Sequence, residues 1–260
     1  GESSSPSNTA GAQGGPGFPA VSLYDNVMLQ KRLVEDVFGD ARIALVMGWS
    51  MGGMQALQWG CLFPTQVRAV LATCCTARCY PHNRVFLEGV KAALTCDHAF
   101  ENGRYRTPPE RGLRAFGRVY AGWAYSQAFF RHELWREQGF GSIEELLRFW
   151  EQDHLGQDAN DLLTVLNTWQ NGDISDNPVF GMDFDAALSA IAMPTRMMPC
   201  TTDLYFTRED ASEDGLRMPG ATVESLESDW GHVAGGAGRE AASHNRILAA
   251  ARALLSGKAS

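Results

Sequence analysis

The chain has 260 residues, 45% of them hydrophobic, and a formal net charge of −8, which allows one large domain with a substantial core. No apolar run approaches the length of a membrane span, and the negative charge argues against a nucleic-acid partner, which a basic patch would normally mark. The six cysteines include an adjacent pair, Cys74 and Cys75, and no CxxC pair, so we expect reduced thiols, a cytoplasmic location and no metal site.

The first predicted elements are a loop and a helix. Residues 1–20 are rich in Gly, Ser and Pro, a composition typical of an irregular segment. From Tyr24 to Phe38 the apolar residues recur at the spacing of one helix face, and Gly39 can end that helix. The next run, Ile43–Gly48, is apolar throughout and of strand length, which is typical of parallel strands that are covered on both faces.

A helix is expected from Met51 and a second buried strand over Val67–Thr73. This alternation with short connections predicts an α/β fold with a mostly parallel sheet. Residues 1–78 would form the N-terminal part of its core. Residues 79–190 are aromatic, helical in pattern and poor in strand runs, so we expect a helical insertion over the sheet.

Residues 191–260 would complete the core. Alternation resumes with the strands Thr195–Cys200 and Ala221–Glu227, and a final helix is expected over Arg239–Leu255. Each of these strands is followed by a short stretch that contains a candidate catalytic side chain.

The segment Gly48-Trp49-Ser50-Met51-Gly52 fits the GxSxG pattern of a nucleophile elbow, with a strand before it and a helix after it. Small flanking residues let the strand and helix approach closely around a strained serine. The backbone N–H of Met51 would then stabilise an oxyanion. The pattern alone is weak, because Gly and Ser are common enough for it to occur by chance.

A serine hydroxyl needs a base, and the base needs a carboxylate that orients it. In the elbow fold these follow in the order Ser, acid, His, each just after a strand. Asp203 and His232 satisfy this order, and we predict the triad Ser50–Asp203–His232. The competing carboxylates are Glu209, Asp210 and Asp229.

With these motifs in place, the chain resembles the homoserine O-acetyltransferase family of α/β-hydrolase-fold acyltransferases. The similarity runs through GWSMGGMQALQW with the following Pro64-x-x-Val67, through FPAVSLYDNVMLQ (18–30), and through Asp203-Leu204-Tyr205-Phe206 and Gly231-His232. The opening GESSSPSN also looks like a Gly/Ser-rich loop of that family. The resemblance implies a helical lid and a serine that passes an acetyl group from acetyl-CoA to a hydroxyl.

Two positions depart from the family pattern. The family generally has an Asp directly after the catalytic His, where this chain has Val233. It also has an Arg in a Gly-Leu-x-x-x-Arg helix, where this chain has Gly117, and Arg118 is displaced by one residue, about 100° around a helix. Homoserine is therefore not the expected acceptor, and Trp49 and Arg118 are the candidate substrate-binding residues.

We accordingly expect a serine-dependent O-acyltransferase that moves an acetyl group from acetyl-CoA to a small alcohol other than homoserine. The alternative is a carboxylic ester hydrolase with the same triad, since water can replace the alcohol. A remote alternative is a non-catalytic binding module on this fold. No bound cofactor is expected, and an acyl-CoA would be a co-substrate.

The elbow strand has too few predicted neighbours. Only a loop and one helix precede it, whereas the second oxyanion donor normally comes from the loop after the third strand of this fold. We therefore expect that N-terminal strands are missing from this chain. About 100 residues that normally precede Gly1, either a separate N-terminal fragment of the same precursor or an omitted part of one longer chain, would complete the sheet and the oxyanion hole.

Overall fold

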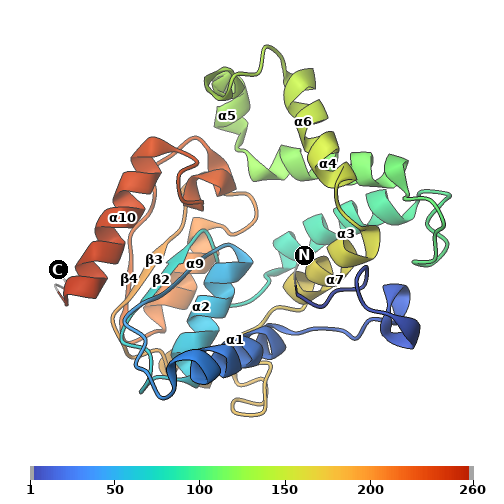
Figure 1. The fold of residues 1–260 in the computed structure, drawn as a ribbon. Coiled ribbons are helices and arrows are strands. Elements are labelled where there is room, and N and C mark those ends of the chain that lie inside the picture. Colours follow the sequence, from blue (N-terminus) through green and yellow to red (C-terminus); the bar gives the residue numbers. More distant parts are fainter. Residues whose placement is uncertain (1–2, 258–260) are drawn as a thin grey trace.

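A four-stranded parallel sheet forms the centre of the protein (Figure 1). The computed structural model describes residues 3–257. The strands lie side by side in chain order, with Val46 opposite Val70, Val70 opposite Thr195, and Thr195 opposite Ala221. They are β1 (Val46–Trp49), β2 (Val70–Thr73), β3 (Thr195–Met198) and β4 (Ala221–Val223).

Helices cover both faces of this sheet. On one face lie α2 (Met51–Leu62), α1 (Leu23–Phe38) and α9 (Arg208–Leu216), and on the other lies α10 (Ala241–Ser256) (Figure 1). Along β2 the side chains alternate between these layers. Val70 and Ala72 belong to the larger core under α2, and Leu71 to the smaller core under α10, as the two-residue period of a strand requires.

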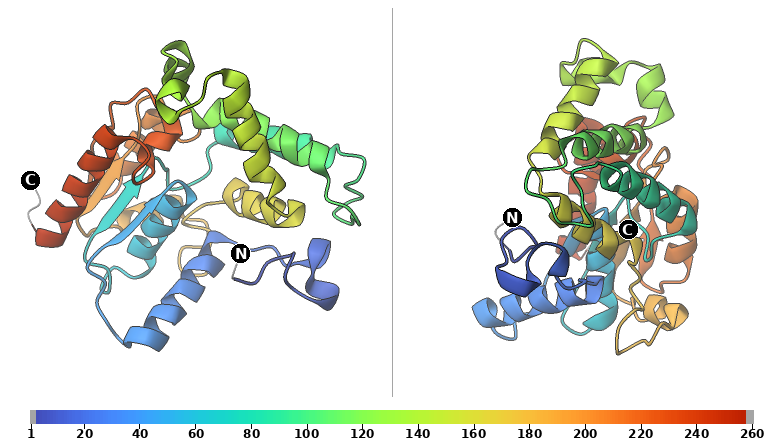
Figure 2. Two further views of the ribbon diagram at one scale, coloured as in Figure 1. Left: turned by 45° about the horizontal axis from the view of Figure 1, so that its top comes forward. Right: turned by 90° about the vertical axis from the view of Figure 1, so that its right-hand side faces the viewer.

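The chain between β2 and β3 is almost entirely helical and lies beside the sheet as a separate group of helices (Figure 2). Within it, α4 packs against α3 and α6, and it also contacts the 3-10 helix η4 (Gly231–Gly235), which follows β4. The group comprises α3 (Pro81–Thr95), α4 (Glu110–Ala124), α5 (Gln127–Arg131), η3 (Leu134–Gln138), α6 (Ile143–Leu155) and α7 (Ala159–Gln170). The short helix α8 (Phe184–Ser189) lies apart from this group and packs against α2.

The predicted first helix matches α1 because its ends carry strong local signals. Ser22 accepts a hydrogen bond from Asp25 N at 3.1 Å, and Ser22 N donates to the Asp25 carboxylate at 2.8 Å, which is a capping box. Gly39 ends the helix with a φ of 63°, a conformation that glycine adopts without a steric penalty. The short 3-10 helices η1 (Gly11–Gln13) and η2 (Gly15–Gly17) precede it.

The first strand is covered only in part, with Val46 packed against the core under α2, and Leu45 and Trp49 against the core under α10. Ile43 makes only an isolated bridge to Val67, and the strand itself begins at Val46. In the described part of the chain β1 pairs with β2 alone, so it is an edge strand, and Met47 is 50% exposed. None of the described helices is long and apolar enough to cross a bilayer.

Candidate active site

Ser50 occupies a strained turn between β1 and α2. Its φ of 60° and ψ of −132° lie in a region that costs a non-glycine residue about 1–3 kcal/mol. A side chain at position 48 would collide with the carbonyl oxygen of Gly52, so only glycine lets the strand and the helix meet this closely. The strain therefore presents the Ser50 hydroxyl at the carboxyl end of β1.

The start of α2 leaves a backbone donor available beside this hydroxyl. Gly53 N and Met54 N donate to the carbonyl oxygen of Ser50 at 2.8 and 3.1 Å. The N–H of Met51 has no hydrogen-bond acceptor among residues 3–257, as expected for the first turn of a helix. It is thus free to stabilise negative charge on an oxygen bound near Ser50.

Asp203 and His232 form a buried hydrogen-bonded pair. Nδ1 of His232 lies 2.8 Å from one carboxylate oxygen of Asp203, and the other oxygen accepts from Tyr205 N at 2.8 Å and Phe206 N at 3.2 Å. Both carboxylate oxygens are therefore engaged and the Asp203 side chain is fully buried. With its proton held on Nδ1, the imidazole offers Nε2 as a base.

The hydrogen bonds of the described residues do not include one between Ser50 and His232. Such contacts often tighten only when substrate binds. The three side chains nonetheless follow β1, β3 and β4, whose carboxyl ends meet at one edge of the sheet.

The competing carboxylates are engaged elsewhere. Asp210 lies in the first turn of α9, where it accepts from the Thr207 hydroxyl at 2.7 Å. Asp229 pairs with His132 at 2.9 Å, and both side chains are about half exposed. Glu209 lies beside Arg208 at the surface. Among the described carboxylates, only Asp203 bonds to His232.

Aromatic rings enclose the His232 imidazole. Trp49 stacks on it at a centroid distance of 5.2 Å and donates its indole N–H to the His232 carbonyl oxygen at 3.1 Å. Tyr205 meets the imidazole edge-on at 4.8 Å, and Phe206 lies 5.6 Å away. Trp49, predicted to bind substrate, thus holds the base. The contacts of Tyr205 and Phe206 with His232 were not predicted. The available sequence signal was that both residues closely follow Asp203.

Cys74 is a buried neighbour of this pair that the sequence did not single out. It follows β2 with a φ of 43°, and its sulfur lies within 4.8 Å of ligand atoms of Asp203 and His232. Burial, and next the nearby Asp203 charge, raise the pKa of this thiol well above its usual range, so the thiol is neutral. Because Asp203 and His232 already bond to each other, we assign no ion to this cluster.

The two departures from the family pattern have different structural settings. A side chain at position 117 would place its Cβ 2.6 Å from the carbonyl oxygen of Trp150, because α4 and α6 pack tightly there. The guanidinium of Arg118 bonds to the carboxylates of Glu144 and Glu151 on α6, which gives no support to its predicted role in substrate binding. Val233 is almost fully buried beside His232.

Comparison with known proteins agrees with this geometry. The profile of the alpha/beta hydrolase family matches residues 8–246. An ethyl acetate hydrolase from Pseudomonas veronii is 35% identical over 236 residues, which cover 90% of this chain and 67% of that protein. A homoserine O-acetyltransferase from Chlorobaculum tepidum is 29% identical over 235 residues, with 86% of this chain and 64% of that protein covered.

Among solved structures, the acetyl esterase MekB superposes with a TM-score of 0.92 at 34% identity, covering 97% of this chain and 73% of that chain. The chain spans about two thirds of the length of the curated relatives it matches.

Proposed function

Because this chain belongs to the alpha/beta hydrolase family, we propose that it is a serine-dependent hydrolase of uncharged carboxylic esters. The observation that carries the proposal is the buried Asp203–His232 pair at the edge of the sheet where the strained Ser50 stands. Each relative reported above acts on an acetyl ester or transfers an acetyl group, according to its name.

The proposed reaction has two halves, acylation of Ser50 and hydrolysis of the acyl-enzyme, and each catalytic group acts once in each half. His232 Nε2 takes the Ser50 proton while Oγ attacks the ester carbonyl carbon, and the Met51 N–H stabilises the oxyanion. The C–O bond to the alcohol breaks and the imidazolium protonates the departing alkoxide. Water then gives a proton to His232 and attacks the acyl-enzyme, and Ser50 leaves with that proton as carboxylic acid is released.

Hydrolysis is favoured over the acyl transfer expected from the sequence. The ethyl acetate hydrolase and the acetyl esterase share more identity with this chain than the acetyltransferase does. Val233 offers no charge to the amino group of homoserine, and the packing of Gly117 against Trp150 excludes an Arg there. Transfer from acyl-CoA to a small alcohol stays the second candidate because Ser50, Asp203 and His232 would serve it equally.

The test is a direct comparison of acceptors. The purified protein is incubated with ethyl acetate, and separately with acetyl-CoA and an alcohol panel that includes homoserine. We expect acetate release from the ester that depends on Ser50 and no acetylated alcohol. Acetylated alcohol formed faster than free acetate would overturn hydrolysis in favour of transfer, and the absence of any acyl-enzyme in intact mass spectra would overturn both.

We further propose that another strand, from an N-terminal fragment of the same precursor, covers the open edge of β1. Val46 N and Ser50 N donate towards β2 at 3.0 Å each, so the N–H groups of Met47 and Trp49 face the open edge. The preceding helix α1 also presents to solvent apolar side chains outside any described pocket lining, namely Val37 and Phe38 at 60 and 69% exposure.

Native mass spectrometry tests this partner. We expect a non-covalent companion of about 10–15 kDa on the purified protein, the mass of about 100 residues. Full activity from a chain that proves alone and monomeric contradicts the proposal.

The six unpaired thiols support our proposal of a reducing, cytoplasmic location.

A further inference from the structure

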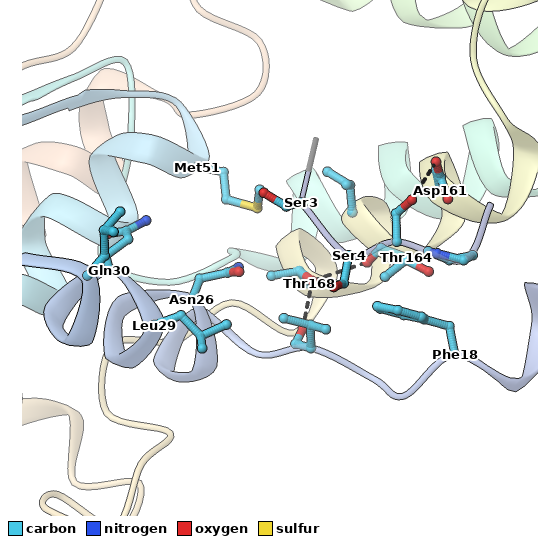
Figure 3. Close-up of a pocket in the computed structure, with 15 residues that line it drawn as sticks. Ser3, Ser4, Phe18, Asn26, Leu29, Gln30, Met51, Asp161, Thr164 and Thr168 are labelled. Atoms are coloured by element: carbon cyan, nitrogen blue, oxygen red, sulfur yellow. Dashed lines mark hydrogen bonds between the residues drawn. The ribbon is translucent and has the colours of Figure 1, made fainter. Parts of the chain in front are cut away.

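A cavity of about 510 Å³ lies beside the Ser50 elbow, on the side of Met51 (Figure 3). Its walls are α1, α7, the first residue of α2 and the segment of residues 3–6. This volume falls within the range of pockets that bind small organic ligands. Because Met51 lines the cavity and also carries the free N–H beside Ser50, the cavity begins where a bound ester group would lie.

The cavity offers no free charge. Asp161 is the one charged residue in its described lining, and this carboxylate already accepts from Ser7 N at 2.9 Å, from the Ser7 hydroxyl at 2.6 Å and from the Ser5 hydroxyl at 3.2 Å. No Lys or Arg is among the lining residues. A phosphate or carboxylate would therefore lose its hydration without gaining a cationic partner.

Some neutral polar groups of the lining are also engaged. The Thr168 hydroxyl donates to the Val21 carbonyl at 2.6 Å, and the Gln30 side chain bonds to Gln55 at 2.6 Å and to the Trp59 indole at 2.8 Å. Four side-chain groups have no hydrogen-bond partner in the described part of the chain, namely the Asn26 amide and the hydroxyls of Thr164, Ser3 and Ser4.

The remaining lining is apolar. Figure 3 shows Asn26 projecting from α1 into the space between the helices, close to Leu29. A ligand here would thus meet largely apolar walls that carry one free amide and three free hydroxyls. The apolar residues are Pro6, Phe18, Val21, Leu29, Leu33, Met51 and Val165.

We propose that this cavity binds an uncharged, apolar substituent of the substrate ester, several carbons long, and that Asn26 limits how apolar this substituent is. The inference rests on the proposed ester hydrolysis and extends it to a substrate class. An acetyl group with a short alcohol would leave most of the 510 Å³ unoccupied, whereas a longer acyl or alcohol chain would displace water from the apolar walls.

Two ester series test the proposal and distinguish the source of the substituent. One keeps the acetyl group and lengthens the alcohol, and the other keeps ethanol and lengthens the acyl chain. We expect kcat/KM to rise in one series by about fourfold for each methylene group that becomes buried, which corresponds to about 0.8 kcal/mol. The series that rises identifies whether the acyl or the alcohol chain occupies the cavity.

Three variants connect the effect to this cavity. Thr164→Phe fills the space between α1 and α7 and should flatten the rising series. Its matched control is Asn167→Phe, an exposed position on the same helix that does not line this cavity. Asn26→Leu should raise kcat/KM for the longest esters by about fivefold or more. A long ester would bury the Asn26 amide without a hydrogen-bond partner, which costs about 1 kcal/mol or more.

The outcomes separate the two proposals. A flat series in the wild-type protein, or a rising series that Thr164→Phe leaves unchanged, overturns the cavity assignment while ester hydrolysis stands. If no ester is cleaved, ester hydrolysis fails, and calorimetry of a long-chain alkyl ketone with Ser50→Ala still decides the cavity. The cavity assignment is supported if the ketone binds and if Thr164→Phe, but not Asn167→Phe, abolishes this binding. The absence of any ketone binding overturns the assignment.

Discussion

Replacing Asp214 with Asn should remove a pH-dependent loss of stability. Asp214 lies on α9 and is fully buried, where it accepts from Ala77 N at 2.7 Å and from the Tyr80 hydroxyl at 2.7 Å. It thereby ties α9 to the segment that leads from β2 into α3. Burial raises the pKa of this carboxyl from 3.8 to about 6, although the two hydrogen bonds oppose the shift.

The size of the effect follows from these pKa values. The unfolded carboxyl releases its proton near pH 3.8, whereas the folded one keeps it until about pH 6. The contribution of Asp214 to the free energy of unfolding is therefore greatest below pH 3.8 and falls by about 3 kcal/mol as the pH rises through 6. Asn has no such proton, but it can still accept from Ala77 N and donate to the Tyr80 oxygen.

Urea denaturation of the wild type and Asp214→Asn, at a series of pH values from 4 to 8, measures this difference. We expect the stability of the wild type relative to the variant to fall steadily across the series and to level off above pH 7. A difference that does not change with pH would refute the reasoning. A difference that grows with pH would show that the hydrogen bonds to the carboxylate outweigh its burial.

Three shorter predictions concern the elbow, the lid and the acceptor. Ser50→Ala should lose fluorophosphonate labelling and turnover, by about 10⁴–10⁶-fold in rate, and labelling of this variant would contradict the assignment of the nucleophile. Gly117→Ala should lower the free energy of unfolding by about 1–3 kcal/mol because its Cβ meets Trp150. The control Gly122→Ala, on the same helix with open space around it, should raise the free energy of unfolding by about 0.5–1 kcal/mol. Equal effects of the two variants in chemical denaturation would show that α4 and α6 are not tightly packed. Homoserine should be a poor acetyl acceptor because Val233 offers it no charge, and steady-state kinetics that prefer it over uncharged alcohols would contradict this.

The parts of the fold with local signals could be predicted from the sequence. The α/β-hydrolase fold is confirmed, and the first helix was placed within one residue because its apolar period begins near Tyr24 and Gly39 marks its end. Strand ends were less predictable. The apolar pattern continues to Cys200, whereas β3 ends at Met198, because apolar composition reports burial and not the extent of the hydrogen-bonded ladder.

The helix α9 was missed, although Thr207 and Asp210 carry the spacing of a helix cap. Its sequence, REDASEDGL, is largely polar and lacks the apolar period on which the predictions relied.

The contacts of the candidate site likewise divide into those that the sequence could predict and those that it could not. Asp203 and His232 could be paired from the sequence because both follow strands and parallel strands end at one edge. The stacking of Trp49 on His232 could not be predicted from the sequence, since it depends on how residues 183 positions apart meet in space. The ion pairs of Arg118 with α6 were equally hidden, because they depend on the packing of two helices within the insertion.

The contact at Gly117 has an evolutionary consequence. Because a Cβ at this position would lie 2.6 Å from the Trp150 carbonyl, no single substitution can introduce a cationic side chain here while α4 and α6 keep their spacing. A lineage with this glycine would first have to accumulate changes along α6 that move its backbone away, and those changes offer no catalytic advantage by themselves. Introducing a cationic side chain at this position thus requires an ordered series of mutations on both helices.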